Sequence, residues 1–539
     1  MTQELSWDQN PENGRLALRF VCYTPHMKHI ARSTLIIAIF FGLEKVLGFI
    51  RQVIIARTFK LSPELDAFNA ANNIPDLLFV LISGGALAMA FIPVLSEYRE
   101  NKGETGTWKL FSQITNIIFL VTSGLSILVA ISARKLVSWE VGIAPGFDSA
   151  QQALVTDLMR LNLIATLLFS LSGLAMAGLQ AHQHFLFPAI APSMYDIGTL
   201  FGVLILAPEK AYQWGPIKLP ALGLGIYGLV YGVIIGAALF LIIQIPALIH
   251  FRFRWTPRLN LQDSGVRKVL RLMGPRVLTV FFIQLIFITQ DNLASRLPTG
   301  AITALVYGWL FMQVPETLIG TALGTALLPT LSEQISRNDP GPFQRTLEKS
   351  IRVILGLTVP LTAILAINLP PVVEILDFGS AGSNLIVWTS RAYLLGLLGH
   401  ALLEVAARAF YAQQNAKIPL IASGLTWAAF LGLGIPLSLW IGAPGIGLAN
   451  TLAFSAEAVL LLILLYRSIP RNPHLKSTLL RVLLATALGS AVSLAGQELI
   501  PPDAFSTFTR LVITAGVTLL SVGFALPFIL PEIKELLDI

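Results

Sequence analysis

The feature that most constrains this sequence is a series of long apolar runs, separated by short stretches that are polar or rich in glycine and proline. A run of about 18 residues or more can cross a bilayer as one α-helix, whereas a membrane β-strand alternates polar and apolar residues over about ten positions. The sequence therefore predicts an all-α polytopic membrane protein with about 14 transmembrane helices. These are centred near residues 43, 80, 122, 165, 197, 236, 282, 314, 362, 399, 428, 455, 487 and 519.

Composition supports this class and excludes others. Hydrophobic residues make up 55% of the chain and charged residues 12%, with a mean hydropathy of +0.72, which is too apolar for a soluble domain of this length. The net charge of +7 suits anionic lipid headgroups, so we expect membrane lipids and no nucleic acid as partners. Cys22 is the only cysteine, which excludes an internal disulfide and a cysteine metal cluster.

Basic residues are concentrated in the even-numbered connections between the predicted helices. The positive-inside rule places these connections in the cytoplasm and, with an even number of helices, both termini as well. We expect residues 1–31 to be a cytoplasmic tail and not a cleavable signal peptide, because they lack a continuous apolar stretch. The basic residues are Arg99, Lys102 and Lys109; Arg252, Arg254, Arg258, Arg267, Lys268 and Arg271; Arg337, Arg345, Lys349 and Arg352; and Arg467, Arg471, Lys476 and Arg481.

An internal repeat organises the chain. Residues 86–97 (ALAMAFIPVLSE) match residues 322–333 (ALGTALLPTLSE), and residues 179–188 (LQAHQHFLFP) echo residues 410–419 (FYAQQNAKIP) at nearly the same offset. Each copy spans six helices, so the two copies share one orientation and are related by an axis along the membrane normal. We therefore predict a tail (1–31), an N-lobe (32–255) and a C-lobe (256–468) with a substrate cavity between them, and two further helices with a C-terminal tail (469–539).

Charged residues interrupt the first predicted helix, where an ionisable group at bilayer depth is costly. Helical spacing places Glu44 and Arg51 on one face and Lys45 on an adjacent one. One interpretation is a structural ion pair between Glu44 and Arg51. The other is a cationic wall, in which Arg51 and Lys45 bind an anionic headgroup. Both faces can reach a central cavity, so Glu44, Lys45 and Arg51 are candidate substrate-binding residues. Arg276, just inside the seventh predicted helix, either faces the same cavity or lies at the membrane surface.

Several acidic residues are candidates for the cavity. Asp66 is a candidate substrate-binding residue, and Asp291 and Glu316 are candidates for a coupling-ion site. Each is also consistent with a structural partner for arginine or with a helix cap. The chain has no nucleophile paired with a base, no phosphate-binding loop and no sequence spacing typical of a metal site, so we expect neither enzymatic activity nor a cofactor.

Helix-breaking residues cluster in the second predicted helix, at Pro75, Gly84 and Gly85. Membrane helices tolerate such residues when neighbouring groups satisfy the freed backbone. Alternatively, they form a hinge for alternating access between the lobes. The clustering of all three in one helix favours the hinge.

Five motifs, spread along the chain, are specific in combination. They are VLGFIRQVIIARTF (46–59), LDAFNAANNIPDLL (65–78), GALAMAFIPVLSEY (85–98), ALGTALLPTLSE (322–333) and RAFYAQQNAKIP (408–419). In this order they resemble the MviN/MurJ family of lipid II flippases, within the multidrug/oligosaccharidyl-lipid/polysaccharide exporter superfamily. The resemblance covers about residues 27 to 530. It implies two six-helix lobes and two extra helices that form a lipid-facing groove.

The resemblance also implies a cationic cavity, which this chain retains in part. Arg51 and Lys45 match cationic positions of the family, whereas Phe79, Val80 and Leu310 stand where the family has arginines. We expect a flippase for lipid II or another polyprenyl-diphosphate-linked glycan in the bacterial cytoplasmic membrane. The membrane potential or a Na⁺ or H⁺ gradient would drive it, and the cell-wall synthesis machinery is a candidate partner. The alternatives are a small-cation exporter of the same superfamily and a non-transporting scaffold for envelope assembly.

Cysteine labelling tests the predicted topology. In a chain in which Cys22 is replaced by serine, single cysteines at Arg254 and Arg471 should react with a membrane-impermeant maleimide only after the cells are opened, because both positions are expected in the cytoplasm. Labelling of either position in intact cells would contradict the predicted orientation.

Overall fold

The structure, a computed structural model, describes residues 25–82, 85–211, 213–214, 217–337, 340–467, 476–498 and 505–537. Two π-helical segments, η1 (Gly202–Leu206) and η2 (Thr317–Thr321), continue α5 and α9, and a hairpin of β1 (Gln213–Trp214) and β2 (Ile217–Lys218) precedes α6. The α-helices are α1 (Pro25–Phe59), α2 (Pro63–Ile82), α3 (Gly85–Ser138), α4 (Ser149–Ala181), α5 (Leu186–Phe201), α6 (Ile226–Ile242), α7 (Ile245–His250), α8 (Ser264–Ala294), α9 (Ala301–Glu316), α10 (Ala322–Ser336), α11 (Pro340–Glu374), α12 (Gly379–Leu394), α13 (Leu397–Ala412), α14 (Lys417–Ile441), α15 (Ala443–Arg467), α16 (Lys476–Glu498) and α17 (Thr507–Leu537).

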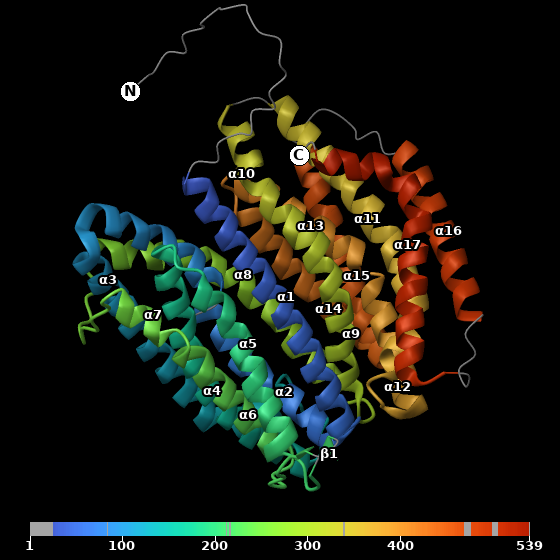
Figure 1. Cartoon of the computed structure of the whole chain (residues 1–539), viewed down its shortest axis with the longest axis horizontal. Coiled ribbons are helices and arrows are strands. Elements are labelled where there is room, and N and C mark those ends of the chain that lie inside the picture. The colour runs from blue at the N-terminus through green and yellow to red at the C-terminus, as the bar shows by residue number, and fades with distance from the viewer. Residues whose placement is uncertain are drawn as a thin grey trace, which may run out of the picture.

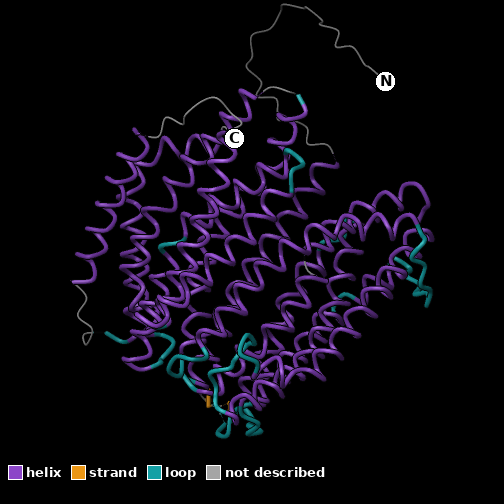
Figure 2. The backbone as a smooth tube through the Cα atoms, turned by 180° about the vertical axis from the view of Figure 1, so that it is seen from behind, coloured by secondary structure: helices purple, strands orange, loops and turns teal. Residues whose placement is uncertain are grey.

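The long helices form one bundle, with the loops gathered at its two ends (Figures 1 and 2). In the described part of the chain, twelve helices are long and apolar enough to cross a membrane, which agrees with the predicted all-α membrane architecture. The helices α1 and α2 cover most of the first two predicted spans but are not among the twelve. Acidic and amide residues interrupt α2, and the side chains of α1 are described only from Phe40 onward. The predicted count of 14 is therefore approximate.

The internal repeat has a counterpart in the backbone. The turn between α4 and α5 places Gln183 in the left-handed region with a φ of 58°, and the turn between α13 and α14 places Gln414 there with a φ of 57°. These two glutamines occupy the same position in the two matched segments, 179–188 and 410–419. The sequence echo thus corresponds to one turn that is built twice.

Two groups of helices pack mainly within themselves. In the first, α4 packs on α2, α3 and α6, and α5 packs on α1 and α6. In the second, α15 packs on α12, α13 and α14, α9 packs on α12, and α8 packs on α14. The last two helices, α16 and α17, pack on each other and on α11. Arg510 of α17 forms an ion pair of 2.5 Å with Glu374 at the end of α11. The residue boundaries of the lobes stay predictions.

Asp66 of α2 joins the first group of helices to the second. Its carboxylate is buried and accepts hydrogen bonds from the backbone N–H groups of Gly300 and Thr303, at 2.5 and 2.9 Å, and from the Thr303 hydroxyl at 2.6 Å. These backbone N–H groups belong to the first turn of α9, which Gly300 begins as its N-cap. The carboxylate therefore caps α9 from another helix, where a negative charge is favourable.

Further contacts join the same two groups of helices at the loop end of α1. The side chain of Arg57 donates a hydrogen bond to the Ile375 carbonyl at 2.9 Å, and Lys60 donates to the Asp377 carbonyl at 2.7 Å. Lys60 also forms an ion pair with the Asp377 carboxylate, which lowers the pKa of that carboxyl from its ordinary value. Polar contacts therefore hold the two groups of helices together at this end of α1.

The cap on α9 can be tested by two substitutions. Asp66→Ala removes every acceptor and leaves buried donors unpaired, each at a cost of about 1–3 kcal/mol. Asp66→Asn keeps one carbonyl oxygen in the same place. We expect the alanine variant to lower the melting temperature of the detergent-purified protein clearly more than the asparagine variant. Equal melting temperatures for both variants and the parent would show that the cap contributes nothing.

Candidate functional site

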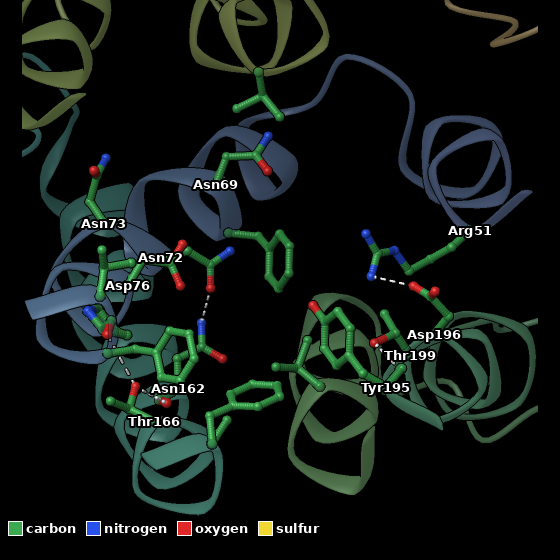
Figure 3. Close-up of a pocket in the computed structure, with 18 of the residues that line it drawn as sticks. Arg51, Asn69, Asn72, Asn73, Asp76, Asn162, Thr166, Tyr195, Asp196 and Thr199 are labelled. Atoms are coloured by element: carbon green, nitrogen blue, oxygen red, sulfur yellow. Dashed lines mark hydrogen bonds and ion pairs between the residues drawn. The ribbon is translucent and has the colours of Figure 1, made fainter. Parts of the chain in front are cut away.

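A cavity of about 790 Å³ lies between α1, α2, α4, α5 and α6 on one side and α8 and α9 on the other. Its volume falls within the range of small-molecule sites. Figure 3 shows its two sides: Asn72, Asn73, Asp76 and Asn162 lie together on one side, and Arg51 lies across the space from them. The cavity therefore has an amide-rich side and an arginine side.

The amide-rich side is built on α2. Asn69, Asn73 and Asp76 are four and three residues apart, which places them on one face of the helix. Asn69 donates a hydrogen bond to the Thr303 hydroxyl at 3.1 Å, and the Asn73 amide donates to the Asp291 carboxylate of α8. This face of α2 therefore lines the cavity and also contacts the second group of helices.

The helix α4 completes this side. Asn162 donates a hydrogen bond to the Asn72 side-chain oxygen at 2.6 Å, and the Thr166 hydroxyl lies 3.4 Å from the Pro75 carbonyl. Asn162 is buried, with 2% of its surface exposed, and its own side-chain oxygen has no hydrogen-bond donor among the described residues. The cavity wall thus retains an unused acceptor.

On the arginine side, Arg51 of α1 is held by α5. Its guanidinium lies 2.7 Å from the Asp196 carboxylate and 4.9 Å from the centre of the Tyr195 ring. Both charged side chains are largely buried, at 16% and 3% exposure. The Arg51 charge is therefore balanced by a neighbouring carboxylate and not left free in the cavity.

The alternative of an ion pair between Glu44 and Arg51 is not what the structure contains. The two residues are seven positions apart, which is a rise of about 10 Å along α1 and too far for direct contact. Glu44 lines the cavity and pairs with Lys45 at 3.2 Å. The Lys45 side chain is 66% exposed and does not line the cavity.

The other predicted site residues are dispersed. Asp291 lines the cavity, whereas Asp66 lies behind it as the cap of α9. Glu316 lies outside the cavity lining, at the end of α9, where its carboxylate accepts a hydrogen bond from Thr321 at 3.1 Å. The side chain of Arg276 lies outside those that the structure describes.

The predicted hinge falls at a helix boundary. Pro75 lies within α2 and lines the cavity, and Gly85 is the first residue of α3. Gly84 lies outside the described residues. The hinge itself stays a prediction.

The charge of the cavity lining differs from the sequence expectation. Among its described residues, Arg51 is the one cation, whereas four carboxylates are present. Aromatic rings line the same space, and Phe79 contacts Phe169 with ring centres 5.8 Å apart. Within the described lining, the expected cationic wall is therefore present at Arg51 alone, and the lining has more carboxylates than cations. The carboxylates are Glu44, Asp76, Asp196 and Asp291.

Sequence reasoning missed the partner of Arg51 and the amide cluster. Asp196 stands in an apolar run far along the chain, and nothing in its local sequence indicates Arg51 as its partner. The amide cluster did leave a signal, because three asparagines in NAANN (69–73) interrupt an otherwise apolar helix. Within the described parts of the chain, no group of three or more His, Cys, Asp or Glu residues is arranged to hold a metal ion.

Comparison with known proteins gives the family. The family model for the lipid II flippase MurJ matches residues 55–516, which is most of the chain. The chain belongs to the lipid II flippase MurJ family. The family is one of transporters and not of enzymes, and its match together with the apolar helices makes the chain a multi-pass inner-membrane protein.

Relatives and solved structures agree with this family. A "Lipid II flippase MurJ" of Burkholderia cenocepacia is 31% identical over 437 residues, which cover 77% of this chain and 82% of the relative. A "Probable lipid II flippase MurJ" of Vibrio cholerae is 26% identical and covers 82% and 83%. The solved structure "Lipid II flippase MurJ, inward closed conformation" matches 93% of this chain and 100% of its own, with a TM-score of 0.73 and 22% identity. This last likeness shows that the MurJ fold is shared.

A more distant fold neighbour is a multidrug resistance MATE family transporter in its inward-facing conformation. It matches 79% of this MurJ-family chain and 94% of its own, with a TM-score of 0.65 and 11% identity. The likeness shows a common arrangement of helices and nothing of the substrate.

The pair of Arg51 with Asp196 can be tested as a unit. Arg51→Gln leaves the buried Asp196 carboxylate without its cation, which commonly costs about 3–5 kcal/mol. The double variant Arg51→Gln with Asp196→Asn removes both charges and should regain most of the lost thermal stability. Glu44→Gln with Arg51→Gln, which leaves Asp196 charged, is the matched control and should not. Recovery in the control alone would contradict the observed pairing.

Proposed function

We propose that the chain moves a polyprenyl-diphosphate-linked glycan, with lipid II as the first candidate, from the cytoplasmic to the outer leaflet by alternating access. Its place would be in peptidoglycan biosynthesis. The observation that carries the proposal is the family match over residues 55–516, joined to a polar cavity between two groups of membrane helices. The headgroup would occupy the cavity, and the prenyl chain would remain in the lipid.

In this proposal Arg51 receives the diphosphate. An arginine fork matches phosphate oxygens in a bidentate geometry, and Arg51 is the one described cation of the cavity lining. Because Asp196 holds the guanidinium in this conformation, binding requires the phosphate to compete with that carboxylate or to share the arginine with it. Lys45, exposed outside the cavity lining, would contribute at the entrance.

The driving force and orientation complete the proposal. The membrane potential supplies about 2.3 kcal/mol per charge per 100 mV, which is enough to bias transport of a charged headgroup. A Na⁺ or H⁺ gradient is the second source of energy that we propose to test. Both termini would be cytoplasmic, and α1 begins and α17 ends at the same end of the bundle (Figure 1). An association with the cell-wall synthesis machinery is proposed on the role alone.

One observation favours a second candidate function, the export of small organic cations. The described cavity lining has more carboxylates than cations, and aromatic rings accompany them. Such a lining suits a positively charged ligand, because aromatic faces and carboxylates both attract cations. The two functions differ in a measurable way, since an exporter would bind organic cations and leave lipid II in place.

A transport assay tests the proposed function. In cells depleted of the protein, a leaflet-resolved lipid II assay should show lipid II accumulating in the inner leaflet, and the parent gene should restore its movement. Arg51→Ala and Lys45→Ala should each slow the movement, with Arg51→Ala reducing it about ten-fold or more because a charge-assisted phosphate contact is lost.

The controls separate charge from folding. Each variant is compared at equal membrane abundance, and Arg51→Gln with Asp196→Asn serves as the stable variant without the cation. Normal lipid II movement in all three variants would show that Arg51 does not bind the headgroup. Binding of organic cations without any effect on lipid II would replace the proposal by the export function.

A further inference from the structure

The two sides of the cavity offer opposite chemistry to a ligand. Arg51 is paired with Asp196, and Glu44 is paired with Lys45. Two carboxylates of the lining, Asp76 and Asp291, have no cation within ion-pair distance among the described residues. A diphosphate is itself negative, so their side of the cavity is unsuited to it.

Both carboxylates neighbour Asn73 of α2. Asp291 reaches from α8 and accepts a hydrogen bond from Asn73, which lies one helical turn before Asp76. Asp291 is buried, with 4% of its surface exposed, whereas Asp76 is exposed to the cavity. No described residue donates a hydrogen bond to Asp76. Its carboxylate is therefore free to bind a ligand.

An independent observation indicates what this side lacks. Asn162 is buried and donates an amide N–H to the Asn72 side-chain oxygen. Its own side-chain oxygen has no hydrogen-bond donor among the described residues. Figure 3 shows this oxygen turned away from Asn72, and it is buried within the cavity wall. An unpaired buried acceptor is costly, and a ligand that donates hydrogen bonds would satisfy it.

We propose that Asp76, with Asp291, Asn73 and Asn162 around it, binds a primary ammonium group carried by the headgroup of the transported lipid. An ammonium group has a positive charge, three N–H donors and no acceptor, which complements the free carboxylate of Asp76, the nearby Asp291 carboxylate and an unpaired amide oxygen. The described chain arranges no group of three metal-ligating acids or histidines, which favours an ammonium group over a metal ion. The inference rests on the proposed transport of a lipid-linked glycan.

The arrangement would also orient the ligand. In Figure 3 Asp76 and Arg51 lie on opposite sides of the cavity, so a headgroup with an anionic diphosphate and a cationic amine would place one charge on each side. A lipid without the amine would keep only the contact with Arg51. The arginine side and the Asp76 side of the cavity would together select a headgroup that carries both charges.

Binding of two matched lipids tests the site. The probes are a polyprenyl-diphosphate-linked glycopeptide with a free primary amine and the same lipid with that amine acetylated, each bound to the purified protein in nanodiscs. The parent protein should bind the free amine about ten-fold or more tightly than the acetylated lipid, since a charge-assisted contact is lost on acetylation. Asp76→Asn should bring this ratio close to one and leave the affinity for the acetylated lipid unchanged.

The matched control is Glu100→Gln, which makes the same charge change at an exposed position of α3 outside the cavity. It should keep the full preference for the amine, and the melting temperatures of all variants should confirm that they are folded. Equal binding of both lipids by the parent protein would overturn the ammonium site while leaving the flippase intact. Binding of neither lipid would overturn the proposed function and this inference with it.

A titration with Na⁺ and K⁺ distinguishes an inorganic cation from the lipid amine. If the amine is the ligand, the preference for the free amine should persist at low salt, and added Na⁺ should weaken it by competition. If both lipids require Na⁺ equally, and Asp76→Asn removes that requirement, the site binds an alkali cation and the ammonium proposal is wrong.

Discussion

The structure depends on one constraint: a polar group within membrane-spanning helices must find its partner inside the protein, because lipid offers none. The contacts between the two groups of helices obey it. Asp66 satisfies the first turn of α9, and the Tyr307 hydroxyl donates a hydrogen bond to the Gln52 carbonyl at 2.8 Å. The residues that interrupt the apolar runs are therefore also those that hold the two groups of helices together.

The cavity is where this constraint is only partly met. Arg51 and Asp196 neutralise each other, whereas Asp76 and the Asn162 oxygen have no partner among the described residues. A buried acceptor such as the Asn162 oxygen is costly unless a ligand or water completes it, and an ionisable group such as Asp76 at membrane depth indicates function. A MurJ-family transporter with a carboxylate-rich cavity lining also differs from the cationic cavity that its motifs imply, and an amine on the transported headgroup would account for the difference.

Hydropathy and repeat pattern predicted the helical architecture because both are local properties of the chain. An apolar run of sufficient length forms a membrane helix whatever its neighbours, and two similar segments build similar turns, as at Gln183 and Gln414. The second predicted span was harder to recognise from hydropathy, because the polar residues of α2 lower its mean hydropathy. Those residues lower it because they serve the cavity and the contacts around it.

By itself the sequence determined the membrane class, the family resemblance, the internal repeat and the presence of costly charges in the first two helices. Only the tertiary structure decided how those charges pair. Helical spacing placed Glu44 and Arg51 on one face of α1, but their separation along the helix prevents contact, and α5 supplies Asp196 instead. In the same way Asp66 became a helix cap and Asp76 a cavity residue, because the role of a carboxylate depends on which helix packs against it.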